Sequence, residues 1–140
     1  MPVAIVGPVR SRHLSVVIRS TPDEVYAFAR TPANLPCWAA GLATGEVHQV
    51  GDALVVESPM GRVTVDFVAP NGLGVLDHDV TLPGGEVVTN PVRVLAHPDG
   101  AEVVFTLRQL GLTDDAFARD AAVVEADLER LRALLESDLD

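Results

Sequence analysis

Residues 113–137, TDDAFARDAAVVEADLERLRALLES, are the stretch of sequence that decides the fold. Thr113 can cap the start of a helix, and the two aspartates that follow it fall in the first turn, where the helix dipole favours negative charge. The spacing predicts a helix from Asp114 to about Ser137, roughly 35 Å long, which is enough to cross the face of a small sheet. Apolar residues recur along it in steps of four and three, at Phe117, Ala121, Val124, Leu128, Leu131 and Leu135. We expect this apolar stripe to cover the concave face of a sheet.

The N-terminal part of the chain predicts one strand followed by two short helices. Apolar and less apolar residues alternate from Leu14 to Ser20, which is typical of a half-buried strand. Residues 21–24, TPDE, then form a capping box with proline at the first helical position. A helix is therefore expected from Thr21 to about Arg30. The same Thr-Pro signal at Thr31 predicts a second, shorter helix.

Between Gly41 and Leu110, closely spaced glycines and prolines separate short runs rich in valine, which is typical of antiparallel strands joined by turns. The predicted strands are Thr44–Val50, Ala53–Ser58, Arg62–Val68, Gly74–Leu82, Glu86–Ala96 and Glu102–Leu110. Together with the first strand they give seven strands. The predicted fold class is α+β, with a seven-stranded curved antiparallel sheet around a long C-terminal helix.

The composition predicts a single domain over residues 1–140 with a mostly aliphatic core. Apolar residues make up 48% of the chain, but only one Trp, one Tyr and four Phe contribute aromatic bulk. The formal net charge is −10, which argues against broad contact with nucleic acid or anionic lipid. All ten cationic residues are arginine, so lysine Schiff-base chemistry, a pyridoxal-phosphate anchor and a P-loop lysine are excluded.

The single cysteine, Cys37, cannot form an intrachain disulfide, and its expected state is a buried, inert thiol. The apolar run from Pro2 to Val9 lacks the basic start and cleavage pattern of a signal peptide. No apolar run approaches the ~20 residues of a membrane span. We therefore expect a cytoplasmic protein without stable membrane insertion.

Residues 15–38, SVVIRSTPDEVYAFARTPANLPCW, resemble the opening of the START/SRPBCC superfamily, which includes polyketide cyclase/dehydrase-like proteins. The order of predicted elements matches that family over nearly the whole chain, and residues 114–122 and 127–136 resemble bacterial members that mostly lack an assigned substrate. The resemblance implies the helix-grip fold, with a deep cavity between the concave sheet face and the C-terminal helix. The family uses this cavity for lipids, polyketides, steroids and similar apolar ligands.

The family resemblance implies no particular reaction, because its members include carriers, aromatase/cyclases and modules that regulate the Hsp90 chaperone ATPase. Our leading hypothesis is a carrier that binds a small apolar metabolite without covalent chemistry. An aromatase/cyclase-type enzyme and a protein-interaction module are the alternatives. No cofactor is expected, and a homodimer is a possible assembly.

The triplet Asp77-His78-Asp79 contains residue types that bind metals, but its spacing argues against a metal site. Neighbouring side chains on a strand point to opposite faces, so His78 cannot share a face with either aspartate. His78 alternates in phase with apolar residues and is expected to point inward, while the aspartates lie on the outer face near Arg93. His78 is therefore the candidate general acid/base if the protein is an enzyme, although a structural core histidine satisfied by a neighbour is the default interpretation.

The hairpin that turns at residues 83–85, Pro-Gly-Gly, fixes the partner of His78. A three-residue loop places His78 opposite Asn90 and Leu76 opposite Val92, and it collects the aliphatic residues of both strands on one face. A one-residue slip would expose half of them. The loop also supplies Gly85 for the left-handed conformation that such turns commonly need.

Tyr26 and Trp38 are amphipathic aromatic residues suited to the wall or rim of a cavity, although structural packing is the alternative for both. Asp23, Glu24 and the exposed acids of the last helix are interpreted as capping and solubilising groups. The predicted ligand-binding residues are Tyr26, Trp38, Leu76, His78, Asn90, Val92, Phe105, Val124 and Leu128.

Overall fold

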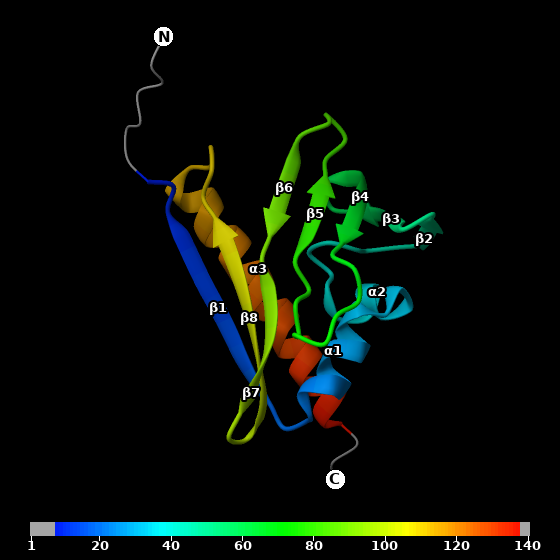
Figure 1. Ribbon diagram of the computed structural model, residues 1–140. Coiled ribbons are helices and arrows are strands. Elements are labelled where there is room, and N and C mark those ends of the chain that lie inside the picture. Colours follow the sequence, from blue (N-terminus) through cyan, green and yellow to red (C-terminus); the bar gives the residue numbers. More distant parts are fainter. Residues whose placement is uncertain (1–7, 138–140) are drawn as a thin grey trace.

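A computed structural model describes residues 8–137 of the chain (Figure 1). Its strands are β1 Ser11–Ile18, β2 Val47–Val50, β3 Ala53–Ser58, β4 Gly61–Phe67, β5 His78–Thr81, β6 Val87–Asn90, β7 Val92–His97 and β8 Gly100–Arg108. Its helices are α1 Pro22–Arg30, the 3-10 helix η1 Pro32–Asn34, α2 Leu35–Trp38 and α3 Asp114–Glu136. The predicted α+β class is confirmed: a curved antiparallel sheet surrounds one side of the long C-terminal helix.

The eight strands form two antiparallel sheets rather than one. The first has the order β1-β8-β7, and the second has the order β2-β3-β4-β5-β6. Figure 1 shows β6 running directly into β7, so that the two sheets follow one another around the curve. The prediction of seven strands in a single sheet is therefore wrong in count, although the order of strands along the chain is as expected.

The extra strand arises because Pro91 divides the segment Glu86–Ala96, which was predicted to be one strand. Proline has no backbone N–H and cannot complete a ladder of hydrogen bonds. Beside it, the N–H of Val92 donates to Asp77 Oδ1 at 2.9 Å, and the Arg93 guanidinium forms an ion pair with the same carboxylate at 2.8 Å. The outward position of Asp77 near Arg93 is thus confirmed, and its carboxylate caps the break in the sheet.

The strand predicted at Gly74–Leu82 is regular only over β5, because its first half turns toward β7. There the N–H of Leu76 donates to Val92 O at 2.8 Å, and the N–H of Val94 donates to Gly74 O at 2.8 Å. Gly74 has a φ of +73°, and a Cβ on it would collide with the Val94 carbonyl. The approach therefore requires glycine. The strand predicted from Thr44 also begins later, with β2.

The helix boundaries follow the capping signals closely. Thr21 Oγ1 accepts the N–H of Glu24 at 3.2 Å, and Thr113 Oγ1 accepts the N–H of Ala116 at 3.1 Å, so both predicted N-caps are confirmed. The second short helix begins as the 3-10 turn η1 and continues as α2. The expected two short helices are therefore three segments.

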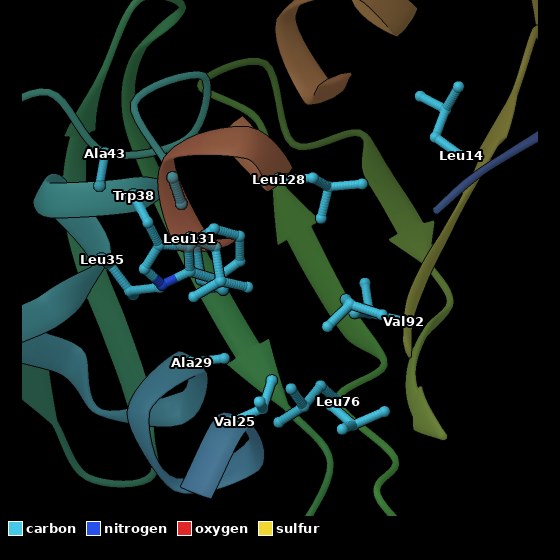
Figure 2. Close-up of a cluster of buried hydrophobic side chains, with 14 of the residues drawn as sticks. Leu14, Val25, Ala29, Leu35, Trp38, Ala43, Leu76, Val92, Leu128 and Leu131 are labelled. Carbon is cyan, nitrogen blue, oxygen red and sulfur yellow. The ribbon is translucent and has the colours of Figure 1, made fainter. Parts of the chain in front are cut away.

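Helix α3 runs diagonally across the sheet and ends by the connection between β1 and α1, where Glu136 Oε2 accepts the N–H of Arg19 at 2.9 Å (Figure 1). It lies closest to β1, β8 and α2. Leu128 and Leu131 point from it into the cluster of buried side chains that Figure 2 shows. The predicted apolar stripe is confirmed, with four of its residues buried and two partly buried: Phe117, Ala121, Leu128 and Leu131, then Val124 and Leu135.

Among the described helices, none is both long enough and apolar enough to cross a membrane.

Candidate functional site

A cavity of about 490 Å³ lies between the sheet and α3. Its walls come from α1, α2, β4 to β8, α3 and the adjoining loops, and most of its lining side chains are apolar. The volume falls in the range of roughly 300–1,000 Å³ that is usual for small-ligand sites. Eight of the nine predicted ligand-binding residues line it: Trp38, Leu76, His78, Asn90, Val92, Phe105, Val124 and Leu128.

Tyr26 is the predicted residue that the fold places elsewhere. Its hydroxyl accepts the backbone N–H of Asn71 at 3.0 Å, and the Arg30 guanidinium lies 5.7 Å from the centre of its ring. Tyr26 borders a separate, smaller cavity of about 220 Å³ near Asn71. Residue 26 lies on the α1 face that meets the loop before β5, a placement that the sequence pattern of α1 alone does not specify.

The hairpin between β5 and β6 has the predicted register. His78 lies opposite Asn90, and Val80 lies opposite Val88. Gly85 has a φ of +95°, as the three-residue loop requires. The register places His78 and Asn90 side by side on an otherwise aliphatic wall, which is where the sequence predicts the polar end of the cavity.

His78 is held as a neutral imidazole in a fixed orientation. Its Nδ1 lies 3.1 Å from Leu76 O, and because a carbonyl can only accept, Nδ1 carries the proton. Its Nε2 lies 3.5 Å from Asn90 Nδ2, which can donate a long, weak hydrogen bond to it. Burial lowers the pKa of His78, while the hydrogen bond to Leu76 and the charges of Asp77 and Asp79 oppose that shift.

Two aromatic rings flank the imidazole. The ring centre of Phe67 lies 5.0 Å from that of His78, and the ring of Phe105 meets it edge-on with centres 6.0 Å apart. These contacts, with the burial of His78, shield the imidazole from water and restrict its orientation. The result is a single, oriented acceptor nitrogen, Nε2, on the Asn90 side of the cavity.

Asp127 is a buried cavity residue that the sequence analysis missed. The sequence analysis gave it no role, but its Oδ2 accepts the backbone N–H of Gly41 at 3.1 Å and its Oδ1 accepts from Arg130. Burial raises the pKa of Asp127, against the lowering effect of these hydrogen bonds. A signal was present: Asp127 lies three residues after Val124 and four before Leu131, which places it on the apolar stripe.

The contact between Asp127 and Gly41 joins α3 to the chain that leaves α2. A Cβ on Gly41 would collide with the Val123 side chain, so only glycine lets the backbone come this close. The buried carboxylate satisfies the N–H that this close approach removes from water. This link fixes the distance between α2 and α3 and therefore the width of the cavity at that end.

We define the mouth of the cavity as the region where its lining side chains are exposed, at the β3–β4 turn, the β8–α3 loop and the outer side of α3. Four exposed apolar side chains surround this mouth: Met60, Leu110, Leu112 and Val123. Leu110 has a φ of +51°, which is unfavourable for a residue with a branched side chain.

Asp120 also lies at the mouth, and partial burial of its carboxyl raises its pKa although the residue is exposed. Arg108 lines the same region and donates to Ser11 Oγ at 2.6 Å.

Trp38 and Cys37 are neighbours on α2 with opposite environments. Trp38 is buried in the cavity wall, and its Nε1–H has no hydrogen-bond partner among residues 8–137. Cys37 is exposed, so the prediction of a buried thiol is wrong: on this short helix the side chain next to a buried tryptophan faces outward.

The triplet around His78 does not gather metal ligands. Within residues 8–137, no group of three or more His, Cys, Asp or Glu side chains is arranged to hold a metal ion. His78 faces the cavity, while Asp77 pairs with Arg93 and Asp79 accepts a hydrogen bond from Thr89 on the outer face.

The architecture matches several solved structures closely. The Aha1 dimer from Colwellia psychrerythraea superposes with a TM-score of 0.73 at 16% identity, over 91% of this chain and 96% of that one. The chain has the helix-grip fold. Protein MLL2253 from Mesorhizobium loti matches with a TM-score of 0.72 at 14% identity, over 92% of this chain and 98% of the other.

DynU16, described as a putative protein in the dynemicin biosynthetic locus, also matches, with a TM-score of 0.72 at 16% identity. The match covers 93% of this chain but 48% of DynU16, so this helix-grip chain corresponds to about half of that protein. No protein-family model matches the chain, and no curated protein matches it by sequence. These likenesses therefore establish the fold and leave the function to be argued from the cavity.

Proposed function

We propose that this protein binds a small apolar metabolite, lipid-like or polyketide-like, inside the cavity between the sheet and α3. The observation that carries the proposal is the cavity of about 490 Å³ with walls that are almost entirely aliphatic and aromatic. Burying apolar surface stabilises a complex by about 25 cal/mol for each Å² removed from water. A ligand that fills such a space gains most of its affinity from contacts that do not depend on its detailed structure.

The binding experiment uses a matched pair of neighbouring valines on β6. Val88 lines the cavity, whereas Val87 is 57% exposed and lies on the outer face. Val88→Phe should fill part of the cavity and weaken saturable uptake of the uncharged dye Nile red, while Val87→Phe should leave it unchanged. Circular dichroism and unfolding midpoints check that both variants fold. Equal dye binding by the two variants, or no saturable uptake by the native protein, would reject the proposal.

An enzyme of the aromatase/cyclase type is the second candidate, and the orientation of His78 favours it. The proton of the neutral imidazole is committed to Leu76, which leaves Nε2 free to take a proton from an acidic C–H or O–H group of a ligand. Turnover of an enolisable polyketide analogue that disappears in His78→Phe, with dye binding retained, would favour this candidate. Binding without turnover favours the carrier.

A third possibility concerns protein partners. The Aha1 neighbour is described as a dimer, which motivates a test for a homodimer here. Light scattering coupled to gel filtration at several concentrations would measure the assembly state. A pull-down from native lysate, with this protein as the bait, tests for a protein-interaction role like that of the Hsp90-regulating members of the resembled family. The ATPase activity of any captured chaperone is then measured with and without this protein.

A further inference from the structure

We propose that the cavity selects uncharged ligands that carry a hydroxyl group, such as apolar alcohols or phenols, and discriminates against carboxylates of the same size. This inference rests on the proposed binding function and specifies its ligand class. It follows from the hydrogen-bonding capacity of the polar residues in the wall and from the charges around the mouth.

The polar pair in the wall presents acceptors to a ligand. His78 Nδ1–H is committed to Leu76 O, so Nε2 offers a lone pair. The amide of Asn90 must turn its Nδ2 toward Nε2, because two acceptors would repel one another. Its Oδ1 then points away from His78 and makes no hydrogen bond to any group of residues 8–137. A ligand hydroxyl can donate to either acceptor, whereas a carboxylate can donate to neither.

The hydrogen bond between the two side chains is easily replaced. At 3.5 Å the contact from Asn90 Nδ2 to His78 Nε2 is at the long limit of a hydrogen bond. A ligand hydroxyl that approaches Nε2 can form a shorter and stronger one.

Among residues 8–137, the wall around His78, whose ring neighbours are Phe67 and Phe105, presents no positive charge that would compensate an anion buried in the cavity. Of the two acids that line the cavity, Asp127 is paired with Arg130 and Asp120 lies at the mouth, and the cation that lines it, Arg108, is exposed and donates to the uncharged Ser11 hydroxyl. The chain as a whole carries a formal charge of −10. A carboxylate that approaches His78 would lose its hydration beside a buried imidazole, and burial opposes the protonation of His78 that could compensate.

The test compares ligands of one shape in competition with Nile red at neutral pH. The three aromatic competitors are naphthalene, 2-naphthol and 2-naphthoate, and an aliphatic pair, 1-dodecanol and dodecanoate, repeats the comparison. We expect each alcohol to displace the dye at a concentration at least about tenfold lower than the matching carboxylate. Equal or better displacement by the carboxylates, while naphthalene still competes, overturns the ligand class but leaves the binding function intact. Failure of every competitor overturns both.

Two substitutions locate the source of the selectivity. His78→Phe keeps a ring between Phe67 and Phe105 but removes the acceptor, so the preference for 2-naphthol over naphthalene should fall about fivefold. Asp120→Asn at the mouth should strengthen displacement by 2-naphthoate, whereas Asp115→Asn, which removes the same charge from an exposed position of α3 outside the cavity, should not. An unchanged naphthol preference in His78→Phe, or equal effects of the two charge removals, contradicts the proposal.

Discussion

Replacing Leu131 or Leu128 by Ala tests how α3 holds the sheet, because the two leucines differ in one respect. Both are buried, at 0% and 2% exposure, and both point from α3 into the core (Figure 2). Leu128 also lines the cavity, whereas Leu131 does not. The side chain of Leu131 is therefore surrounded by protein atoms on all sides, and that of Leu128 faces open space on one side.

Truncating a fully packed leucine costs about 2–5 kcal/mol, the sum of lost burial and of the new void. Leu131→Ala should fall in the upper half of that range. Leu128→Ala should fall near its lower end, because the cavity already lies beside it and fewer contacts are lost. At roughly 3 °C or more for each kcal/mol, the two variants should melt at clearly different temperatures.

The assay is urea unfolding followed by far-ultraviolet circular dichroism, with the exposed Leu134 of the same helix replaced by Ala as the control. We expect the order of stability to be Leu134→Ala, Leu128→Ala and Leu131→Ala, from most to least stable. A midpoint of Leu131→Ala that matches the control would refute the packing of α3 through its stripe. Equal losses for Leu128 and Leu131 would refute the cavity beside Leu128.

Three further predictions concern the cavity wall and its mouth. Burial lowers the pKa of His78 in the folded chain below its ordinary value of 6.5, so the unfolded chain binds the proton first as the pH falls. The contribution of the neutral His78 to the free energy of unfolding is therefore complete above pH 6.5 and decreases as the pH falls below that value. Urea midpoints should therefore fall more steeply between about pH 7.5 and 5.5 in the native protein than in His78→Phe, and equal slopes would count against a buried neutral imidazole. Asp127→Ala leaves the N–H of Gly41 unpaired and should cost about 1–3 kcal/mol in urea unfolding, while Asp127→Asn retains an acceptor and should cost less; equal losses would mean that the link to Gly41 is not the cause. Leu110→Gly relieves the left-handed conformation at the mouth and should hold or raise the melting temperature, whereas Leu112→Gly should lower it, and a similar decrease in both variants would rule out strain at Leu110.

The sequence predicts the parts of the fold that depend on local spacing. The stripe of α3 and its Thr113 cap depend on residues a few positions apart, and both are confirmed. The register of the hairpin is confirmed for a similar reason: a turn of three residues leaves one pairing that puts His78, Val80 and their partners on a single face.

The features that the sequence does not predict depend on contacts between distant segments. Pro91 is visible in the sequence, but the break that it makes is stabilised by Asp77, which is 15 residues away from the N–H that it accepts. Tyr26 fits a cavity wall by its chemistry, yet its hydroxyl binds Asn71, in the loop before β5. The position of Asp127 places it on the apolar stripe, but an acidic side chain favours the surface because burying an unpaired carboxylate costs free energy. Its hydrogen-bond partner, the N–H of Gly41, is 86 residues away along the chain, so the sequence gives no sign that the carboxylate is paired.

The sole tryptophan of the chain lies in the wall of the cavity. Indole emission shifts to shorter wavelength in apolar surroundings, and it responds to any molecule that enters next to the ring. Native Trp38 fluorescence is therefore a built-in optical readout of occupancy, free of interference from a second indole. Ligand libraries can be screened on the unlabelled protein, with the emission maximum and intensity recorded for each compound. The same property makes it possible to detect whether the protein, as first isolated from cells, already carries a molecule that is lost on extraction.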